Sequence, residues 1–298
     1  MDANSRILCF GEILWDLLEG KKLPGGAPMN VALHLNKMGL DVRLISRIGA
    51  DRWGTEMEEY LKSTGFHNYL LQRDPYYPTG WAQVDMKGPN NPHYMFPDSA
   101  WDHLELDFNV KSSLQESDIL VYGSLIARNC ESRRTLMNML NDSNIYRVFD
   151  MNLRQPNYTK DTVESLLQKA DLLKVNEHEL QVLTSWFFKP DSEANVLKRI
   201  RDRFKCSVIT LTRGENGASV LYGEQYFTRP GYKVRVADTI GAGDAYLAGF
   251  LKGLLWNRDP ESILSFACAA GAYVASRTGA NPSYEQEEIH RIMYQQDH

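Results

Sequence analysis

The stretch DTIGAGDAYLAGF, at residues 238–250, places a Gly-Ala-Gly step between two aspartates and runs directly into an apolar repeat. Tyr246, Leu247 and Phe250 recur at three- and four-residue spacing, which predicts that a helix begins within the stretch. The N–H groups at a helix N-terminus attract anions, so a carboxylate in the same turn competes with any anion that binds there. Such an arrangement needs a chemical reason.

Two common phosphate-binding motifs do not supply that reason. The P-loop pattern G-x-x-x-x-G-K-[ST] occurs nowhere in the 298 residues, and the dinucleotide fingerprint needs a small residue at the position of Tyr246. In the interpretation that remains, the N–H groups of Gly241, Ala242 and Gly243 cradle a phosphoryl group while Asp244 deprotonates the alcohol that attacks it. The alternative is an ordinary glycine turn with an acid in the first helical turn.

The composition is that of a soluble globular protein with a sizeable core, since 43% of the residues are apolar and 24% are charged. A net charge of −5 without any basic block argues against nucleic-acid binding. No segment approaches the ~20 apolar residues of a membrane span, and the first residues do not resemble a signal peptide, so we expect a cytoplasmic protein. The scattered cysteines indicate free thiols, and no zinc motif is present.

Strand and helix patterns alternate from residue 6 to residue 65, which predicts parallel strands joined by crossover helices. The region 69–104 departs from this alternation, because two short extended runs flank the turn-rich sequence KGPNNP at 87–92. A hairpin inserted into an α/β domain suggests a lid. The alternation returns near residue 118.

The sequence PGGAPMN, at residues 24–30, carries two glycines directly before a predicted helix. Glycines there allow a polyhydroxy ligand to approach the backbone, and Asn30 offers both a donor and an acceptor. Asp16, just after the first strand, can accept two hydroxyl hydrogen bonds. The alternative is a tight turn with a proline inside the next helix.

In FDMNLRQ, at residues 149–155, Asp150, Asn152 and Arg154 alternate and therefore point to one side if the strand continues. They lie at the carboxyl end of a predicted strand, where open α/β sheets bind ligands. Arg154 suits a phosphate, while Asp150 and Asn152 suit hydrated magnesium or hydroxyl groups. An ordinary exit from a strand is the competing interpretation.

Two further stretches follow strands. In KVNEHEL, Asn176 and Glu179 have the spacing of a capping box, which is compatible with a second role in which the carboxylate steers magnesium through water. In TLTRGENGAS, Thr212, Gly214 and Gly217 follow a strand, so a nucleotide could rest there, although any β-turn looks similar.

Together these stretches resemble the ribokinase-like (PfkB) family of carbohydrate kinases over nearly the whole chain. GGAPMN resembles the amino-terminal signature of that family, and DTIGAGDAY matches its carboxyl-terminal signature D-T-x-G-A-G-D, with an N-x-x-E between them. The resemblance implies a single domain over 1–298 with a three-layer α/β/α fold and a mostly parallel central sheet. It also implies a small β-sheet lid, formed mainly from about 69–104.

The resemblance implies transfer of the γ-phosphate of ATP to a sugar hydroxyl in the presence of magnesium. It makes Asp244 the base and Gly241, Ala242 and Gly243 the anion hole. The sugar would be held by Asp16, Gly25, Gly26, Asn30 and Arg154. The nucleotide would contact Asn176, Thr212, Gly214, Gly217 and Gly243, with Glu179 near the magnesium ion.

The aromatic residues Trp81, Tyr94 and Phe96 of the expected lid could stack on the sugar or exclude water, and the alternative is that they form a small core of the lid itself. Many family members also bind potassium beside the anion hole. The matching positions here are Asp238, Ile240, Val274, Arg277, Gly279 and Ser283. Where ribokinases often place an asparagine near the adenine, this chain has Cys268.

The stretch GEILWDLLEGKKLPGGAPMN, at 11–30, is most similar to bacterial fructokinases, whose first strand commonly reads G-E-x-L-x-D. We therefore expect D-fructose to be phosphorylated at its 6-hydroxyl, with 2-keto-3-deoxygluconate, ribose or a nucleoside as alternative acceptors. A non-catalytic sugar-binding relative is a further alternative, and the intact Gly241, Gly243 and Asp244 argue against it. The sequence does not show the oligomeric state, but lid sheets in this family often pair across dimers, so the resemblance makes a homodimer through the lid possible.

Overall fold

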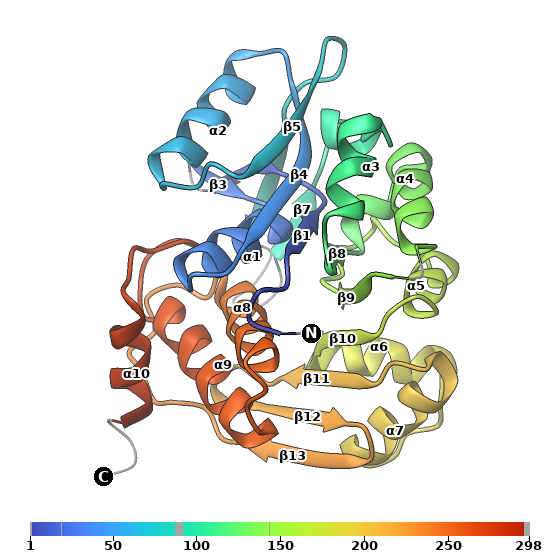
Figure 1. The fold of residues 1–298 in the computed structure, drawn as a ribbon, viewed down its shortest axis with the longest axis vertical. Helices are drawn as coiled ribbons and strands as arrows, with labels where there is room; N and C mark the ends of the chain where they lie inside the picture. The colour runs from blue at the N-terminus through green and yellow to red at the C-terminus, as the bar shows by residue number, and fades with distance from the viewer. Residues whose placement is uncertain (1, 19, 87–91, 143, 295–298) are drawn as a thin grey trace.

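The computed structural model describes residues 2–18, 20–86, 92–142 and 144–294. Its largest element is a nine-stranded sheet (Figure 1). In spatial order the strands are β13 (Gln225–Arg229), β12 (Ala218–Tyr222), β11 (Val208–Thr212), β10 (Leu172–Asn176), β9 (Tyr146–Asp150), β8 (Ile119–Gly123), β1 (Ile7–Phe10), β4 (Val42–Gly49) and β5 (Tyr69–Asp74). The strands from β11 to β5 are parallel, and β12 and β13 add an antiparallel hairpin at one edge.

Both faces of this sheet are buried. The four residues of β1 are all apolar, and successive side chains enter opposite layers: Ile7 and Cys9 belong to one core cluster, Leu8 and Phe10 to the other. A continuous apolar run of this kind is typical of a parallel strand covered by helices on both faces.

Ten helices cover the two faces in the described part of the chain. Figure 1 shows α8, α9 and α10 on one side of the sheet and the helices from α3 to α7 on the other. The first core cluster is shared by α1 (Ala27–Lys37), α2 (Arg52–Ser63), α8 (Ala242–Leu255), α9 (Pro260–Ala275) and α10 (Gln286–Tyr294). The second is shared by α3 (Phe108–Gln115), α4 (Cys130–Leu140), α5 (Lys160–Leu167), α6 (Glu177–Phe187) and α7 (Glu193–Phe204). The predicted three-layer arrangement is therefore confirmed. Among the described helices, none is long and apolar enough to span a bilayer.

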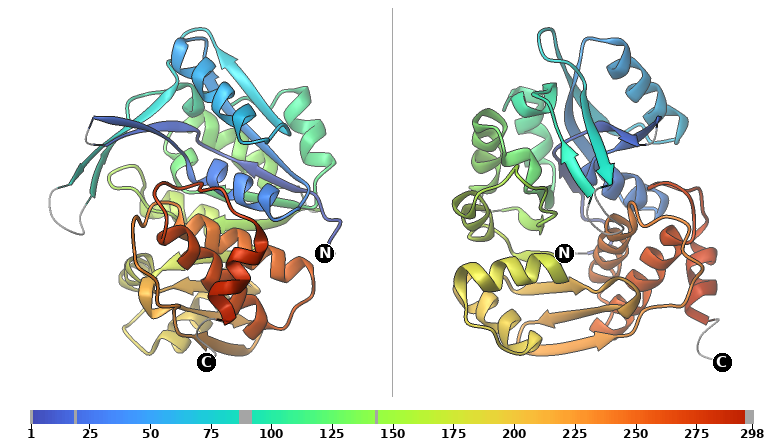
Figure 2. Two further views of the ribbon diagram at one scale, coloured as in Figure 1. Left: turned by 90° about the vertical axis from the view of Figure 1, so that its left-hand side faces the viewer. Right: turned by 180° about the vertical axis from the view of Figure 1, so that it is seen from behind.

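A separate four-stranded sheet, the lid sheet, has the order β3 (Lys21–Gly25), β2 (Leu14–Leu18), β6 (Gly80–Met86) and β7 (Pro92–Met95). Figure 2 shows these strands extending away from the large sheet. The predicted hairpin is present as the antiparallel pair of β6 and β7. Its turn, at 87–91, lies outside the described residues.

The prediction that the lid forms mainly from about 69–104 is incomplete. Half of the lid sheet comes from β2 and β3, which precede the first helix, and β5 joins the large sheet beside β4 instead. The sequence pattern did not separate β1 from β2, because both are apolar runs that follow each other within a few residues.

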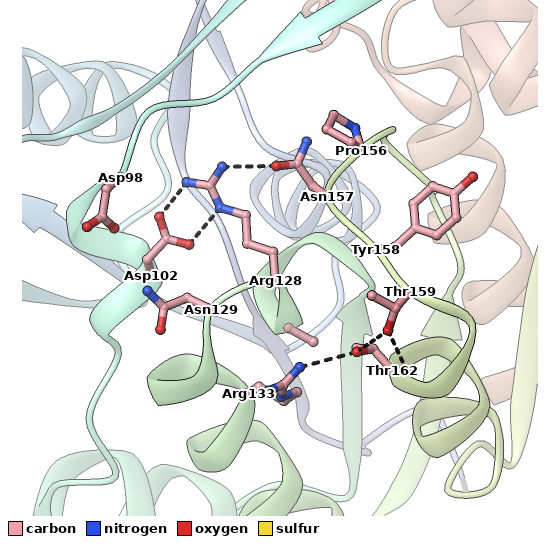
Figure 3. A pocket seen from close by; sticks show the side chains of 11 residues that line it. Asp98, Asp102, Arg128, Asn129, Arg133, Pro156, Asn157, Tyr158, Thr159 and Thr162 are labelled. Carbon is pink, nitrogen blue, oxygen red and sulfur yellow. Dashed lines mark hydrogen bonds and ion pairs between the residues drawn. The ribbon is translucent and has the colours of Figure 1, made fainter.

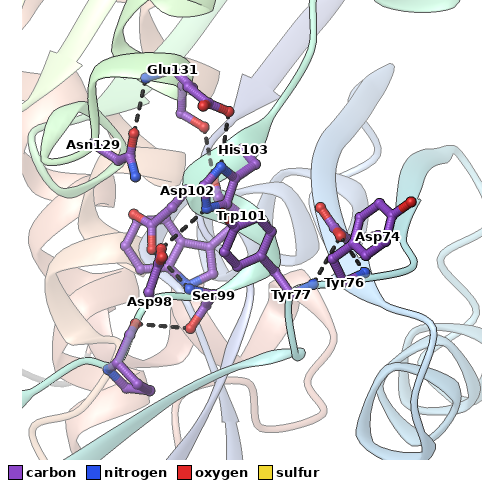
Figure 4. A network of polar contacts seen from close by, with 12 residues as sticks. Asp74, Tyr76, Tyr77, Asp98, Ser99, Trp101, Asp102, His103, Asn129 and Glu131 are labelled. Carbon is purple, nitrogen blue, oxygen red and sulfur yellow. Dashed lines mark hydrogen bonds and ion pairs between the residues drawn. The ribbon is translucent and has the colours of Figure 1, made fainter.

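The segment that leaves β7 is tied to the main body by the guanidinium of Arg128. This group pairs with the carboxylate of Asp102, which is 1% exposed, and donates to the carbonyl oxygens of Phe96 and Pro97 at 3.1 and 2.6 Å. Beside it, in the short 3₁₀ helix η1 (Ala100–His103), a histidine ring bridges two carboxylates on different elements (Figure 4).

That ring belongs to His103, whose Nδ1 lies 2.9 Å from Glu131 and whose Nε2 lies 3.1 Å from Asp98. Tyr77 stacks on it with ring centroids 3.6 Å apart (Figure 4). Although burial alone would lower the pKa of His103, the hydrogen bonds of its ring to both carboxylates and their negative charges raise it. The exit of the lid sheet is thus held by a polar network rather than by apolar packing alone.

We predict that Arg128→Met lowers the free energy of unfolding by about 3–5 kcal/mol, because it leaves the buried Asp102 carboxylate without its ion-pair partner. Urea unfolding followed by circular dichroism measures the change. The matched control is Arg134→Met on the exposed face of α4, which should change the stability by no more than about 0.5 kcal/mol. Equal stabilities for the two variants would contradict the prediction.

Candidate active site

A cavity of about 490 Å³ lies where several parallel strands of the large sheet end and the lid sheet begins. Residues just after β1 and β9 contribute to its wall together with residues of β2, of β10 and of the start of α8. The predicted site residues that line it are Asp16, Gly26, Asn30, Phe96, Arg154, Asn176, Thr212, Ile240, Gly241, Gly243, Asp244 and Gly279. We call it the sugar-side cavity.

A second cavity, of about 480 Å³, adjoins the first. We call it the nucleotide-side cavity. The two share Thr212, Thr239 and Gly243 in their walls, so they meet at the N-terminus of α8. The predicted residues that line this second cavity are Thr212, Gly214, Gly217, Ala242, Gly243 and Cys268.

The turn that opens α8 requires glycine at its first position. Gly241 has φ 77°, in the left-handed region, and a Cβ there would lie 2.6 Å from the Cα of Ala280. At Gly243 an added Cβ would lie 3.2 Å from the Nζ of Lys174. The N–H of Ala242 donates to the carbonyl of Thr239 at 3.3 Å, which closes the turn. The backbone at the mouth of the helix is therefore bare where the two cavities meet.

Asp244 stands in the first turn of α8, and its Oδ2 accepts a 2.8 Å hydrogen bond from the Nδ2 of Asn30. Burial and the nearby charge of Asp150 raise its pKa to about 6, against the opposing effects of Lys174, Asn30 and Arg154. A carboxylate with its pKa raised towards neutrality accepts a proton more readily than an exposed one.

Two more acids face the same cavity. Burial raises the pKa of Asp16 to about 6 and that of Glu12 to about 7, and in both cases the charge of Arg154 counteracts the rise. Glu12 is only 2% exposed, and within the described chain its Oε2 has no hydrogen-bond partner. The sequence interpretation missed Glu12, although a charged residue within a buried apolar run is itself an indication of function.

The polar residues of FDMNLRQ, at 149–155, do not all face the same cavity in the structure. Asn152 and Arg154 line the sugar-side cavity, and the Arg154 guanidinium lies 4.9 Å from the ring centroid of Tyr94. Asp150 instead is buried and pairs with Lys174 at 2.8 Å. Asn152 has φ 38°, so the strand does not continue and the expected alternation ends there.

Lys174 is a further residue that the sequence interpretation missed. Although burial alone would lower its pKa, the negative charges of Asp150, Glu179 and Asp244 raise it, so the ammonium group stays protonated. It lies directly behind Gly243 and therefore places a fixed positive charge next to the anion hole. A lysine inside an otherwise apolar strand, in DLLKVN, was the available signal.

Asn176 and Glu179 form the predicted capping box at the start of α6. The Asn176 Oδ1 accepts from the Glu179 N–H and the Glu179 Oε2 from the Asn176 N–H, both at 2.9 Å. The other oxygen of Glu179 accepts from the N–H of Leu153 at 2.9 Å. Asn176 faces the sugar-side cavity, whereas the carboxylate of Glu179 is buried behind it, so its role towards magnesium stays a prediction.

The prediction that Trp81 contacts the sugar is wrong. In the parallel pair of β2 and β6, Trp81 lies opposite Trp15 and Ala82 opposite Asp16, so Trp81 projects from the face that Asp16 does not use. It packs against the first core cluster. Gly25 does not line the cavity either, but a side chain there would collide with the carboxylate of Asp16. Phe96 does line the cavity and stacks with Tyr94.

Of the residues expected around potassium, Val274 lies in the last turn of α9, and the others lie on the two loops that precede α8 and follow α9. Asp238 accepts from the N–H of Ile240 at 3.0 Å and from the N–H of Gly279 at 3.2 Å, which joins the loops. The Val274 carbonyl accepts from the N–H of Arg277 at 2.9 Å, and the Ser283 carbonyl accepts from the hydroxyl of Tyr273 at 3.4 Å. Asp238 and Gly279 are thus in direct contact, and Ile240 and Gly279 line the sugar-side cavity beside Gly241.

A third cavity, of about 390 Å³, lies between the starts of α4 and α5 (Figure 3). It contains none of the predicted site residues. Its arginines are already engaged, since Arg128 contacts Asp102 and Asn157, and Arg133 donates to Thr162 at 3.2 Å. The candidate active site is therefore the pair of cavities that meet at Gly243.

An acid-lined cavity beside bare backbone at a helix N-terminus is the arrangement that a group-transfer enzyme of the α/β class requires. Comparison with known proteins agrees. A family model described as pfkB family carbohydrate kinase matches residues 2–287. Probable fructokinase-6, chloroplastic, from Arabidopsis thaliana is 29% identical over 96% of this chain and 82% of its own length. Fructokinase-1 of Oryza sativa subsp. japonica is 29% identical over 96% of this chain and 97% of its own length.

Solved structures show the same fold. The fructokinase of Xylella fastidiosa with bound ATP superimposes with a TM-score of 0.88 at 22% identity over 99% of this chain and 100% of that chain. The fructokinase of Vibrio cholerae O395, in a form with fructose, ADP and calcium bound, gives a TM-score of 0.85 at 26% identity over 98% of this chain and 100% of that chain. The chain belongs to the pfkB family of carbohydrate kinases, so the resemblance and the fold class inferred from its sequence are confirmed.

We predict that kcat/KM for the sugar falls as the pH drops through the range from about 7 to about 6, because burial raises the pKa values of Glu12, Asp16 and Asp244 to that range and the base must be ionised. Initial rates of ADP release between pH 5 and 9 measure the profile. A profile that stays flat down to pH 5 would show that no raised carboxyl pKa governs turnover.

Proposed function

We propose that this carbohydrate kinase is an ATP-dependent fructokinase that phosphorylates D-fructose at its 6-hydroxyl. The observation that carries the proposal is the position of Asp244 where the two cavities meet, beside the bare backbone of Gly241 and Gly243. An acceptor alcohol in the first cavity and a triphosphate in the second would bring their reacting atoms together at this point. The similarity of the chain to fructokinases supports fructose as the acceptor.

In the proposed reaction, Asp244 takes the proton of the 6-hydroxyl while the oxygen of that hydroxyl attacks the γ-phosphorus. The new P–O bond forms as the bond to the β-phosphate oxygen breaks, and ADP leaves with the electron pair. The N–H groups of Gly241 and Gly243 and the charge of Lys174 stabilise the negative charge that develops on the phosphoryl group. Positioning and electrostatics supply the catalysis, since no covalent intermediate is needed.

Recognition of the sugar is assigned to the wall formed by Asp16, Gly26, Asn30 and Arg154. Carboxylate and amide oxygens accept hydrogen bonds from hydroxyl groups. Phe96 covers an apolar part of the same wall. Ribose, 2-keto-3-deoxygluconate and nucleosides are the competing acceptors, because a single pocket contact discriminates between acceptors by only ~1–3 kcal/mol.

The nucleotide is assigned to the cavity lined by Thr212, Gly214, Gly217 and Cys268. Magnesium would neutralise charge on the phosphates, and the carboxylate of Glu179 is the donor of suitable chemistry, acting through water. For potassium, the carboxylate of Asp238 and the backbone oxygens of its neighbouring loops offer the oxygen donors that a hard cation prefers.

We also infer a homodimer formed through the lid sheet and a cytoplasmic location. The lid sheet leaves β3 and β7 as edge strands, which can pair with another chain. Four free cysteines, three of them buried, support a reducing compartment.

We predict that Asp244→Asn lowers turnover at least ~100-fold, the usual scale for loss of a general base. The assay is ADP release with Mg-ATP and fructose, ribose, 2-keto-3-deoxygluconate, glucose or adenosine. Highest turnover with fructose, lost in the variant, supports both the substrate and the base. Highest turnover with another acceptor would retain the mechanism and reject fructose, and near-normal turnover in the variant would reject the base.

The same variant has its own control for folding. Because the pKa of Asp244 is raised from its ordinary 3.8 to about 6 in the folded protein, stability falls as the pH rises through this range, and the full cost of the ionised carboxylate is present above about pH 6. A neutral amide removes this cost, so the unfolding temperature of Asp244→Asn at pH 7.5 should be no lower than that of the native protein.

We predict that Gly243→Val raises KM for ATP at least ~10-fold, because a branched side chain fills the point where the two cavities meet and approaches Lys174. Steady-state kinetics with ATP varied at saturating sugar measure the effect. The unfolding temperature serves as the control for folding. Unchanged ATP kinetics in a folded variant would contradict the assignment of the anion hole.

A further inference from the structure

Asn281 lies in the loop between α9 and α10, in the wall of the sugar-side cavity, and no motif singled it out. Its Nδ2 donates to the Oδ1 of Asn30 at 2.6 Å. The Nδ2 of Asn30 in turn donates to the Oδ2 of Asp244 at 2.8 Å. Two amides from distant parts of the chain thus lead, in series, to the carboxylate at the mouth of α8.

The chemistry of these groups gives the series a fixed direction. An ionised carboxylate only accepts hydrogen bonds, so Asn30 must turn its nitrogen towards Asp244. Its carbonyl oxygen then faces Asn281, which must present its own nitrogen. Without a donor at position 281, the amide of Asn30 loses one of the two hydrogen bonds that fix its orientation.

The loop that carries Asn281 is anchored independently of this series. The ring of His34 is buried in α1 and lies 2.9 Å from both the carbonyl of Ala280 and the hydroxyl of Tyr284. Burial lowers the pKa of His34 to about 3, so the ring is neutral, and the carbonyl obliges Nε2 to carry its proton. Lys37 donates to the Asn281 carbonyl at 3.1 Å.

We propose that Asn281 is a positioning residue of the phosphoryl transfer: it fixes the amide of Asn30 so that Asn30 holds the carboxylate of Asp244 towards the acceptor hydroxyl. This inference deepens the proposed function and rests on it, because it takes Asp244 as the base. Asn281 acts through Asn30, and its contribution is the orientation of that amide.

Loss of these two hydrogen bonds changes the pH dependence of kcat. The hydrogen bond from Asn30 lowers the pKa of Asp244, against the larger effects of burial and of Asp150. Without it, the pKa rises and the acid limb of kcat moves to higher pH. The other charged groups that face this carboxylate stay in place: Glu12 after β1, Asp16 in β2, Asp150 in β9, Arg154 after β9 and Lys174 in β10.

The test is the pH profile of kcat between pH 5 and 9 for Asn281→Leu and Asn281→Asp, measured with the acceptor that the native enzyme uses best. Leucine has a similar shape but no donor. Aspartate only accepts, so it draws the nitrogen of Asn30 away from Asp244. We expect the acid limb to move up by roughly one pH unit with leucine and further with aspartate. The free energy of a one-unit shift in pKa is a part of the free energy of a hydrogen bond to a charged group.

The matched control is Tyr284→Phe, at a residue of the same loop as Asn281. This change removes the hydroxyl that contacts His34 of α1 and leaves the two amide hydrogen bonds intact. It should lower the unfolding temperature without moving the acid limb. If Asn281→Leu lowers kcat equally at every pH, or if the control moves the limb as far, Asn281 has only a structural role and the proposal is overturned.

Asp244→Asn, assayed in parallel, separates this inference from the function on which it rests. If that variant retains turnover, Asp244 is not the base and the proposed function fails together with the inference. If it loses turnover while the limb of Asn281→Leu stays in place, the inference alone fails.

Discussion

The proposed chemistry depends on one constraint: a carboxylate and the bare backbone proposed to bind the phosphoryl group must share a single helical turn. Gly241 can adopt φ 77° and lie against Ala280 only because it has no side chain, and this contact sets the start of α8. Asp244 then stands in the first turn of the same helix, where the backbone dipole favours its charge and burial opposes it. Every other feature of the site adjusts the balance between these two effects.

Buried charged groups, rather than solvent, set the pKa of Asp244. Lys174 pairs with Asp150 behind Gly243, so a positive charge faces the phosphoryl side while a negative charge raises the pKa of Asp244. A buried ion pair of this kind contributes little net stability, because desolvation offsets its attraction. The two apolar clusters on either face of the large sheet stabilise the fold instead, which allows the site to keep desolvated charges.

Whether the sequence could predict a feature depends on how far apart along the chain its interacting residues lie. The turn at the start of α8 and the capping box of α6 are local, and both lie where the sequence placed them. Trp81 was assigned to the wrong face because the pleat of β6 depends on its register with β2, a pairing that no local pattern reveals. Asn281 was missed for the same reason, since the partner that gives it a role lies in another segment of the chain. For Lys174 the local pattern signals a buried charge, but it does not show that Asp150 and Gly243 are the neighbours.

The chemistry and the recognition of the acceptor belong to different parts of the molecule. Asp244, Gly243 and Lys174 are supplied by α8 and the large sheet, whereas Asp16, on the sugar side, belongs to the lid sheet. Arg154 spans the two, because it follows β9 and lies over the ring of Tyr94 in β7. Under the proposed function, a chain with this division can change the shape of its lid sheet, and with it the acceptor, while the turn at the start of α8 stays intact. The motif in that turn then identifies the reaction, and the lid sheet selects the alcohol that receives the phosphate.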